Sequence, residues 1–420
     1  MIKNRPYLLL VLLTISLALT AQEVDKCGYD LLLEQSLERN PAMAERMAEV
    51  ETFTQEWISN QANRPAQTRE IITIPVVVHV LWNEASEDIS NLQVYSQIGI
   101  LNEDFRMRNE NVGDIPDDFK ALAADVGFEF CLATLTPEGD ITDGITRTQT
   151  EWPCIGDFNT TTESGVPRLF YSILGGQDPW DPRRYLNIWV APTCNAFLGF
   201  GFNPGQSDSP QEDGVVLDTD YFGNVCNDGR NHHLGRTTTH EIGHYFNLKH
   251  IWGNKGCDGV DDDFVEDTPP QDNFHLGCPT HPSVSCGSAD MYMNFMDYTD
   301  DACISMFTIG QRDRMHAAIN GPRSGLLNSN RCLFINQPRP DLGITVFPNP
   351  VSDCIHVEFN ANFDDDVTVL LYDSSGKRIY EAINNASNIR SIPADGLSPG
   401  VYYLHLTNGS TKVSERILVQ

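Results

Sequence analysis

After the N-terminal region, the apolar positions of the chain form runs that are typical of strands. Residues 71–81 (IITIPVVVHVL) are a nearly continuous β-branched series, which is typical of a strand buried on both faces. Residues 89–105 then carry apolar side chains at helical spacing, and residues 128–132 and 185–191 predict two further strands. A short apolar run at 214–218 predicts a strand that we expect to form the sheet edge where an extended substrate pairs. The pattern predicts an α/β layer.

The next segment, TTTHEIGHYFNLKH, combines helical periodicity with polar residues at fixed intervals. His240 and His244 are four residues apart, so one helix face presents both imidazoles. Glu241 can then reach a water on an ion that they hold. His250 joins them only if the chain turns back, and Asn247 is the residue best suited to the left-handed conformation that ends the helix. Three neutral nitrogen ligands with one open position predict a hydrolytic zinc site.

Regular patterning nearly vanishes in residues 251–293, which are rich in Gly, Pro, Asp and Cys. We expect an irregular lower subdomain held by disulfides and ions. The four cysteines of this region allow three pairings, of which we favour Cys257–Cys286 with Cys278–Cys303. The acidic stretch between residues 257 and 267 offers oxygen ligands for calcium, with Asp262, Asp263 and Asp267 as candidates. The alternative is an ordinary acidic loop, because the EF-hand spacing is absent.

Residues 293–303 (MNFMDYTDDAC) predict a tight turn before a helix that begins near Thr308. A turn of this kind places Met296 beneath the ligand histidines as an apolar base. Tyr298 then lies close enough to hydrogen-bond an anionic intermediate, or is simply a buried tyrosine whose hydroxyl finds a partner.

Composition limits the partners and the compartment. The 420 residues carry a net charge of −30, which argues against nucleic acid and anionic membranes as partners. Residues 1–21 have the basic start, apolar run and small-residue end of a signal peptide, and no stretch predicts a stable membrane span. Eleven cysteines in an exported chain indicate disulfides, with one cysteine left for another task.

Residues 22–69 are acidic and helix-prone, show no strand signal, and end in a polar segment of the kind that proteases cut. We interpret them as a pro-segment. Cys27 lies near its start, and a thiolate there would fill the open zinc position until the segment is removed. The alternative is that Cys27 is simply unpaired or forms a disulfide.

The combination His240-Glu-Ile-Gly-His244-x5-His250 with Asn294-Phe-Met296-Asp-Tyr298 resembles the metzincin zinc endopeptidases. Flanking segments (Ile251-Trp-Gly, Asp267-Thr-Pro, Cys278-Pro and Asp301-Ala-Cys303) resemble the pappalysin family, in its cytophagalysin branch. The resemblance covers about residues 70–330. It implies an α+β catalytic domain: a twisted mixed sheet with a backing helix and an active-site helix, above the disulfide-rich lower subdomain.

The same resemblance implies roles for individual residues. It makes His240, His244 and His250 the zinc ligands and Glu241 the general base and acid. It makes Met296 the Met-turn residue and Tyr298 the stabiliser of the transition state, and it implies structural calcium without naming its ligands. The departure from the general metzincin pattern is Asn247, which stands where that pattern has glycine.

Residues 331–340 predict a linker, and short strands with turn signals in residues 341–420 predict a small all-β sandwich. Phe347-Pro-Asn-Pro350 and Leu397-Ser-Pro-Gly400-Val-Tyr-Tyr403 resemble the type A sorting domain of type IX secretion. The resemblance implies a Gram-negative bacterium, export through the periplasm by the type IX machinery, and release or attachment at the cell surface. A glycan-binding role for this domain is the alternative.

Together these features predict a monomeric secreted zinc endopeptidase, made as a latent precursor, that cleaves protein or peptide substrates. The alternatives are a thermolysin-like site with Glu266 as third ligand, and a non-catalytic surface adhesin with structural zinc. The apolar residues 304–307 favour a non-acidic wall in the pocket beyond the cut. We expect ordinary surface or packing roles for the remaining histidines of the domain (His232, His233, His275 and His281).

Overall fold

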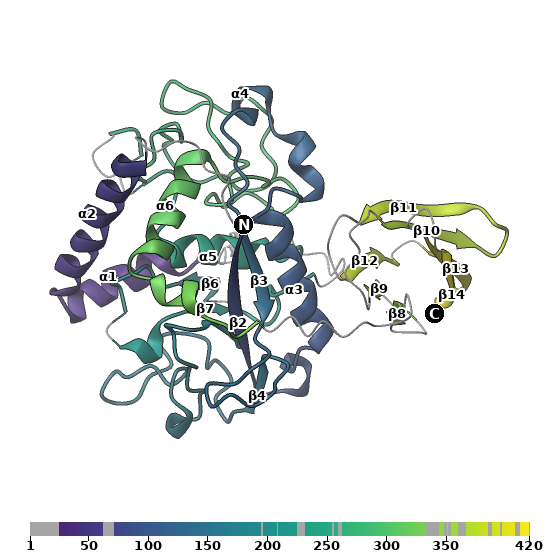
Figure 1. Ribbon diagram of the computed structural model, residues 1–420, viewed down its shortest axis with the longest axis horizontal. Helices are drawn as coiled ribbons and strands as arrows, with labels where there is room; N and C mark the ends of the chain where they lie inside the picture. The colour runs from purple at the N-terminus through teal and green to yellow at the C-terminus, as the bar shows by residue number, and fades with distance from the viewer. Residues whose placement is uncertain are drawn as a thin grey trace, which may run out of the picture.

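The computed structural model describes residues 25–61, 71–194, 196–207, 209–224, 232–253, 256–258, 263–332 and most of 344–419. Among them no helix is both long and apolar enough to cross a membrane. Figure 1 shows a large α/β body and, beside it, a smaller all-β unit at the C-terminus.

A seven-stranded mixed sheet forms the centre of the larger body. Its strands run in the order β1-β6-β7-β5-β2-β3, with β4 also paired to β2. The long strand β2 is parallel to β5 on one side, and on the other to β3 along its first half and β4 along its second. Only β6 runs antiparallel to its neighbour β7. The strands are β1 (Asp25–Cys27), β2 (Ile72–Trp82), β3 (Phe128–Leu132), β4 (Ile145–Gln149), β5 (Leu186–Val190), β6 (Phe197–Gly201) and β7 (Val215–Leu217).

Helices cover this sheet and enclose the main core. The side chain of Ser90 caps α3 by accepting from the Gln93 N–H, and Thr308 with Gln311 forms a capping box at the start of α6. Apolar residues of the sheet, α3, α5 and the turn around Met296 form one buried cluster. The helices of the body are α3 (Asn91–Asp104), α4 (Asp117–Lys120), α5 (Arg236–Tyr245) and α6 (Ile309–Asn320). Short 3-10 turns are η1 (Ala85–Glu87), η2 (Glu110–Asp114), η3 (Ser172–Leu174), η4 (Pro210–Glu212), η5 (Gly256–Asp258) and η6 (Ser324–Asn328).

The sheet edge differs from the prediction. Strand β7 lies inside the sheet, between β5 and β6, so residues 214–218 are not the edge. The strand outside it, β6, has the sequence FLGFG, and glycines weaken a strand signal. Gly201 is required here, because a Cβ would lie 2.3 Å from the carbonyl oxygen of Glu241.

Residues 25–61 wrap around the body as one strand and two helices. Although their sequence shows no strand signal, β1 pairs in parallel with β6, with Cys27 opposite Gly199. A three-residue strand with two charged residues (DKC) is too short and too polar for a periodicity to reveal it. The helices α1 (Tyr29–Arg39) and α2 (Met43–Gln61) follow, and α2 lies beside α6 (Figure 1).

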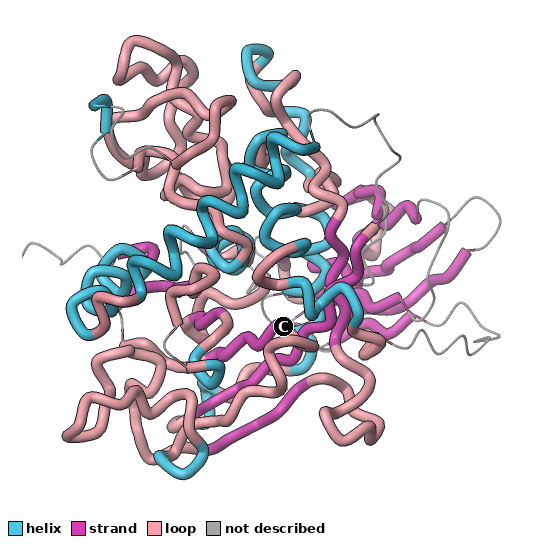
Figure 2. The backbone as a smooth tube through the Cα atoms, turned by 60° about the vertical axis from the view of Figure 1, so that its left-hand side comes forward, coloured by secondary structure: helices cyan, strands magenta, loops and turns pink. Residues whose placement is uncertain are grey.

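The segment after α5 is irregular, and loops dominate it (Figure 2). The disulfides Cys257–Cys286 and Cys278–Cys303 are the two pairs favoured from the sequence. Cys131–Cys332 and Cys154–Cys194 link other parts of the body.

The C-terminal unit consists of two antiparallel sheets, in the orders β11-β10-β13-β14 and β12-β9-β8. Their inward side chains form a hydrophobic core that shares no residue with the main one. The strands are β8 (Ile344–Phe347), β9 (Cys354–Phe359), β10 (Val367–Asp373), β11 (Arg378–Asn384), β12 (Ile389–Pro393), β13 (Gly400–Thr407) and β14 (Lys412–Val419). The fold class is therefore the predicted one, an α+β body followed by a small β-sandwich.

Candidate metal centre

Helix α5 carries two of the three predicted ligands and is entirely buried. The carboxylate of Asp301 accepts from the backbone N–H groups of Leu234 and Arg236, which satisfies donors at the helix start. The helix ends at Tyr245, and Asn247 follows with φ of 71°, the left-handed conformation expected from the sequence. The guanidinium of Arg314 donates to the carbonyl of Asn247 and fixes this turn.

The turn brings His250 to the other two histidines. The Nε2 atom of His244 lies 3.2 Å from that of His240 and 3.2 Å from that of His250. Two nitrogens bound to one tetrahedral ion at 2.0–2.1 Å are separated by about 3.3–3.4 Å. The three imidazoles therefore fit a single zinc-sized cation.

Each imidazole is oriented by a partner on its other nitrogen. His240 Nδ1 donates to the carbonyl of Phe295 at 2.7 Å, and His244 Nδ1 donates to that of Leu248 at 3.0 Å. His250 Nδ1 lies 3.1 Å from a carboxylate oxygen of Asp30. A proton on Nδ1 leaves the Nε2 lone pair directed at the cluster. Burial also lowers the pKa of His240 and of His244 well below the usual value, which favours the neutral, metal-binding form.

Cys27 completes the cluster from the sheet edge. Its sulfur and the ligand nitrogens of the three histidines all lie within 4.8 Å of one another. Among the described residues this is the only group of three or more His, Cys, Asp or Glu ligands close enough to share an ion. The thiol of Cys27 also donates to Glu241 Oε2 at 3.4 Å. Burial, followed by the charge of Glu241, raises the pKa of this thiol in the absence of an ion.

The turn containing Met296 forms the apolar floor of the site, beneath the histidines. Met296 is fully buried, and a Cβ on Gly243 of α5 would lie only 2.5 Å from its sulfur. The neighbouring carbonyl of Phe295 is the one that orients His240. The turn and the helix are thus fitted to each other without space for a methyl group.

Tyr298 extends from the same turn to the N-terminal segment. Its hydroxyl donates to the carbonyl oxygen of Cys27 at 3.4 Å, and its ring lies edge-on to His250, 5.1 Å between centroids. The phenol therefore already binds a backbone carbonyl beside the cluster.

Lys26 enters a buried site beside the cluster. Its ammonium donates to the carbonyl of Thr299 at 3.0 Å, and the negative charges of Asp301 and Asp297 oppose the lowering of its pKa by burial. Residues 304–307 instead belong largely to the main core. The apolar stretch expected to form a non-acidic wall therefore packs largely inward, and the Lys26 ammonium is attracted by the charges of two buried carboxylates, Asp301 and Asp297.

His275, for which we expected an ordinary surface or packing role, connects two loops through hydrogen bonds. His275 Nδ1 lies 3.0 Å from Asp297 Oδ2, and its Nε2 contacts Ser283 at 3.0 Å. Asp297 in turn accepts from the Tyr298 N–H and from the side chain of Gln271. No spacing in the sequence links these residues, because they meet through irregular loops.

The calcium candidates are only partly described. Asp262 lies outside the described residues. Asp263 is buried and accepts from the Val265 N–H and the Thr268 hydroxyl, whereas Asp267 accepts from the Gly310 N–H. The Asp263 carboxylate is thus engaged in a local turn, whereas the Asp267 carboxylate bonds a residue 43 positions away and its Oδ1 is buried without a hydrogen-bond partner among the described residues.

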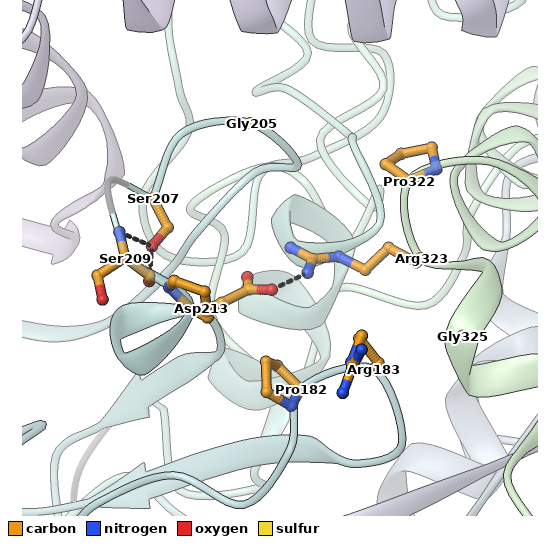
Figure 3. Close-up of a pocket in the computed structure, with 10 residues that line it drawn as sticks. Pro182, Arg183, Gly205, Ser207, Ser209, Asp213, Pro322, Arg323 and Gly325 are labelled. Atoms are coloured by element: carbon orange, nitrogen blue, oxygen red, sulfur yellow. Dashed lines mark hydrogen bonds and ion pairs between the residues drawn. The ribbon is translucent and has the colours of Figure 1, made fainter.

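The lining of a cavity of about 280 Å³ includes none of the three histidines (Figure 3). Asp213 and Arg323 form an ion pair on its wall, and Arg323 also donates to the carbonyls of Tyr245 and Phe202. These bonds connect Arg323 to the last residue of α5 and to the residue after β6.

Comparisons with known proteins agree with this geometry. Residues 175–320 match the peptidase M43 model described as pregnancy-associated plasma protein-A, and residues 345–420 match the secretion system C-terminal sorting domain. The structure of a mutant of Tannerella forsythia promirolysin is similar, with a TM-score of 0.64 and 36% identity over 72% of this chain and 97% of that one. Mature mirolysin from the same organism, in complex with a cleaved peptide, gives 0.58 and 39% over 63% and 97%. An extracellular metalloprotease of Arthroderma benhamiae is 28% identical, over 67% of this chain and 81% of its own.

Proposed function

This chain belongs to the pappalysin family of metzincin metalloproteases, and we propose that His240, His244 and His250 hold a catalytic zinc ion with Glu241 as its general base. The chain is a metalloendopeptidase that is secreted or attached to the cell surface. The observation that carries the zinc assignment is the convergence of three Nε2 atoms, with that of His244 3.2 Å from each of the other two and each imidazole oriented through Nδ1.

The bound ion would lower the pKa of a water molecule and polarise the scissile carbonyl. Glu241 takes the proton of the attacking water and passes it to the leaving amine. Tyr298 donates its hydroxyl hydrogen bond to the oxygen of the substrate carbonyl as negative charge develops there. Its contact with the Cys27 carbonyl supports this role, because the hydroxyl already donates to a backbone carbonyl beside the histidines.

Latency is assigned to residues 22–69, with Cys27 as the zinc-blocking residue. Three contacts support it: the sulfur lies in the histidine cluster, the thiol binds Glu241, and β1 covers the free side of β6. The precursor of mirolysin also matches a larger share of this chain than its mature form does.

The remaining boundaries complete the proposal: a signal peptide at 1–21, the catalytic domain at 70–330, a linker at 331–340 and the sorting domain at 341–420. The sorting domain would bring the chain to the type IX secretion machinery. A structural calcium ion is proposed for the acidic loop that ends at Asp267, where Asp262 and Asp263 are the other candidate ligands.

The geometry around Lys26 supports a preference for substrates with a basic residue. The Lys26 ammonium is buried where the Thr299 carbonyl accepts from it and the charges of Asp301 and Asp297 offset part of the cost of removing a positive charge from water. We propose that the side chain next to the cut is lysine or arginine. Cleavage of peptide libraries, read by mass spectrometry, should show this enrichment; cleavage without it would exclude the preference.

The test of the catalytic assignment is Glu241→Ala. The variant should keep one zinc per chain and lose turnover by about 10²–10⁴-fold, because only the proton carrier is removed. Zinc content is measured by atomic emission and activity on a quenched peptide. Full activity would refute the role of Glu241. Absence of bound zinc from the wild type would refute the metal site, and zinc without any cleavage would favour the adhesin alternative.

A further inference from the structure

The three ligand histidines differ in the origin of the partner that orients them. The partners of His240 and His244 are carbonyls of Phe295 and Leu248, which belong to the proposed catalytic domain. The partner of His250 is the carboxylate of Asp30, in the first turn of α1. That residue lies within the proposed pro-segment, 3.1 Å from Nδ1.

The residue before Asp30 adds further contacts to the same ligands. The ring of Tyr29 stacks on His244 with centroids 4.1 Å apart and planes 7° from parallel, and meets His250 edge-on at 5.6 Å. Trp252 of the catalytic domain stacks on His250 at 4.3 Å. The third imidazole is thus fixed by stacking from its own domain and by a hydrogen bond and an edge contact from α1.

A carboxylate bound to the outer nitrogen of a ligating imidazole fixes its tautomer and orientation and makes the inner nitrogen a stronger donor. Loss of such a partner typically weakens metal binding by about 10–100-fold. A backbone carbonyl fixes the tautomer too, but it carries no full negative charge. Of the three ligands, only His250 has a charged partner among the described contacts, and this partner departs when residues 22–69 are removed.

We propose that the N-terminal segment helps to retain the metal as well as blocking it. Asp30 orients His250 and strengthens its Nε2 as a zinc ligand. The precursor should therefore bind zinc more tightly than it would with the Cys27 thiol but without this carboxylate. This inference rests on the proposed zinc site. Removal of the segment then exposes the open coordination position and weakens metal retention at the same time.

Asp30 suits a substitution test because its side chain is 53% exposed, so its loss leaves no cavity. The full-length precursor is prepared as wild type, Asp30→Ala, Asp30→Asn and Glu34→Ala. Glu34 is an exposed carboxylate of the same helix and is the matched control. Zinc affinity is measured by competition with a chromogenic chelator, and thermal unfolding of each metal-free protein verifies the fold.

Asp30→Ala should bind zinc about 10–100-fold more weakly than wild type. Asp30→Asn should show a smaller loss, because the amide oxygen still accepts from Nδ1, and Glu34→Ala should match wild type. The loss should persist in a Cys27→Ala background, which separates the carboxylate from the thiol. Equal affinities for wild type and Asp30→Ala would overturn the inference, whereas a wild-type precursor without zinc would overturn the proposed function itself.

Discussion

At the scale of single residues, His275 gives the site a pH dependence. Hydrogen bonding to Asp297, only partly offset by burial, raises the pKa of this imidazole, and the more distant Asp290 acts in the same direction. A pKa raised by folding means that protonated His275 stabilises the native state. This contribution is complete below the unfolded pKa of about 6.5 and is lost as pH rises through the folded value.

We therefore expect His275→Gln to be less stable than its parent at pH 5.5 and nearly equal to it at pH 9. The difference at low pH should be about 1 kcal/mol or less, because solvent partly screens this incompletely buried group. Thermal unfolding is measured in the Glu241→Ala background, where self-cleavage does not interfere. A stability difference that is the same at both pH values would show that His275 acts by packing alone.

The residues that the sequence did and did not identify differ in a physical way. His240 and His244 are related by helical periodicity, and Asn247 marks the turn that His250 requires, so local rules were sufficient. His275, Asp30 and Lys26 meet their partners through loops or across separate elements. No local rule relates such positions, and only tertiary structure reveals them.

At the scale of elements, the fit between α5 and the turn below it depends on Gly243. A Cβ there would lie 2.5 Å from the Met296 sulfur, which is buried and has little room to move. Overpacking of this kind costs about 1–3 kcal/mol. Gly243→Ala should therefore destabilise the protein, although alanine alone would favour the helix by about 1 kcal/mol.

Urea unfolding measures this cost, again in the Glu241→Ala background. Gly113→Ala is the control, because a Cβ at that exposed glycine meets nothing within 4 Å. The double variant Gly243→Ala/Met296→Ala should lose less stability than the two single losses combined, since the second change makes room for the first. Additive losses would show that the contact is not tight.

Elements were predicted where an apolar pattern extends over many residues, as in β2 and α3, and residues 22–69 were correctly expected to be helix-prone. In the larger body, strands β1, β4 and β6 were not predicted. Strand β1 is three residues long, β4 (ITRTQ) has one large apolar side chain, and β6 contains two glycines required by close packing. Strands β1 and β6 form the sheet edge beside the site, so the arrangement of the N-terminal segment on the enzyme was beyond the reach of sequence patterns.

At the scale of the whole molecule, residues 25–61 contact the body in three separate places. Strand β1 extends the sheet, α1 lies over the histidines, and α2 is anchored on α6. The anchor is a two-pronged ion pair in which the Arg314 guanidinium donates to both oxygens of Glu51, at 2.9 and 2.8 Å. Arg314 also supports Asn247, so the anchor is connected to the turn that positions His250.

Because the contacts are distributed, removal of the thiol alone should not release the segment. Cys27→Ser in the intact precursor should give only a small fraction of the mature rate, since β1 still extends the sheet, α1 still lies over the histidines and α2 still anchors the segment on α6. Glu51→Ala leaves Arg314 without its carboxylate, a loss of about 1–3 kcal/mol for a charged hydrogen bond. The double variant Cys27→Ser/Glu51→Ala should thus be several-fold more active than Cys27→Ser. Adding Glu56→Ala to Cys27→Ser, an exposed change on the same helix, should leave the rate unchanged.

Initial rates on a short quenched peptide are compared before any mature band appears on a gel. A Cys27→Ser precursor that reaches the mature rate would mean that the thiol alone maintains latency.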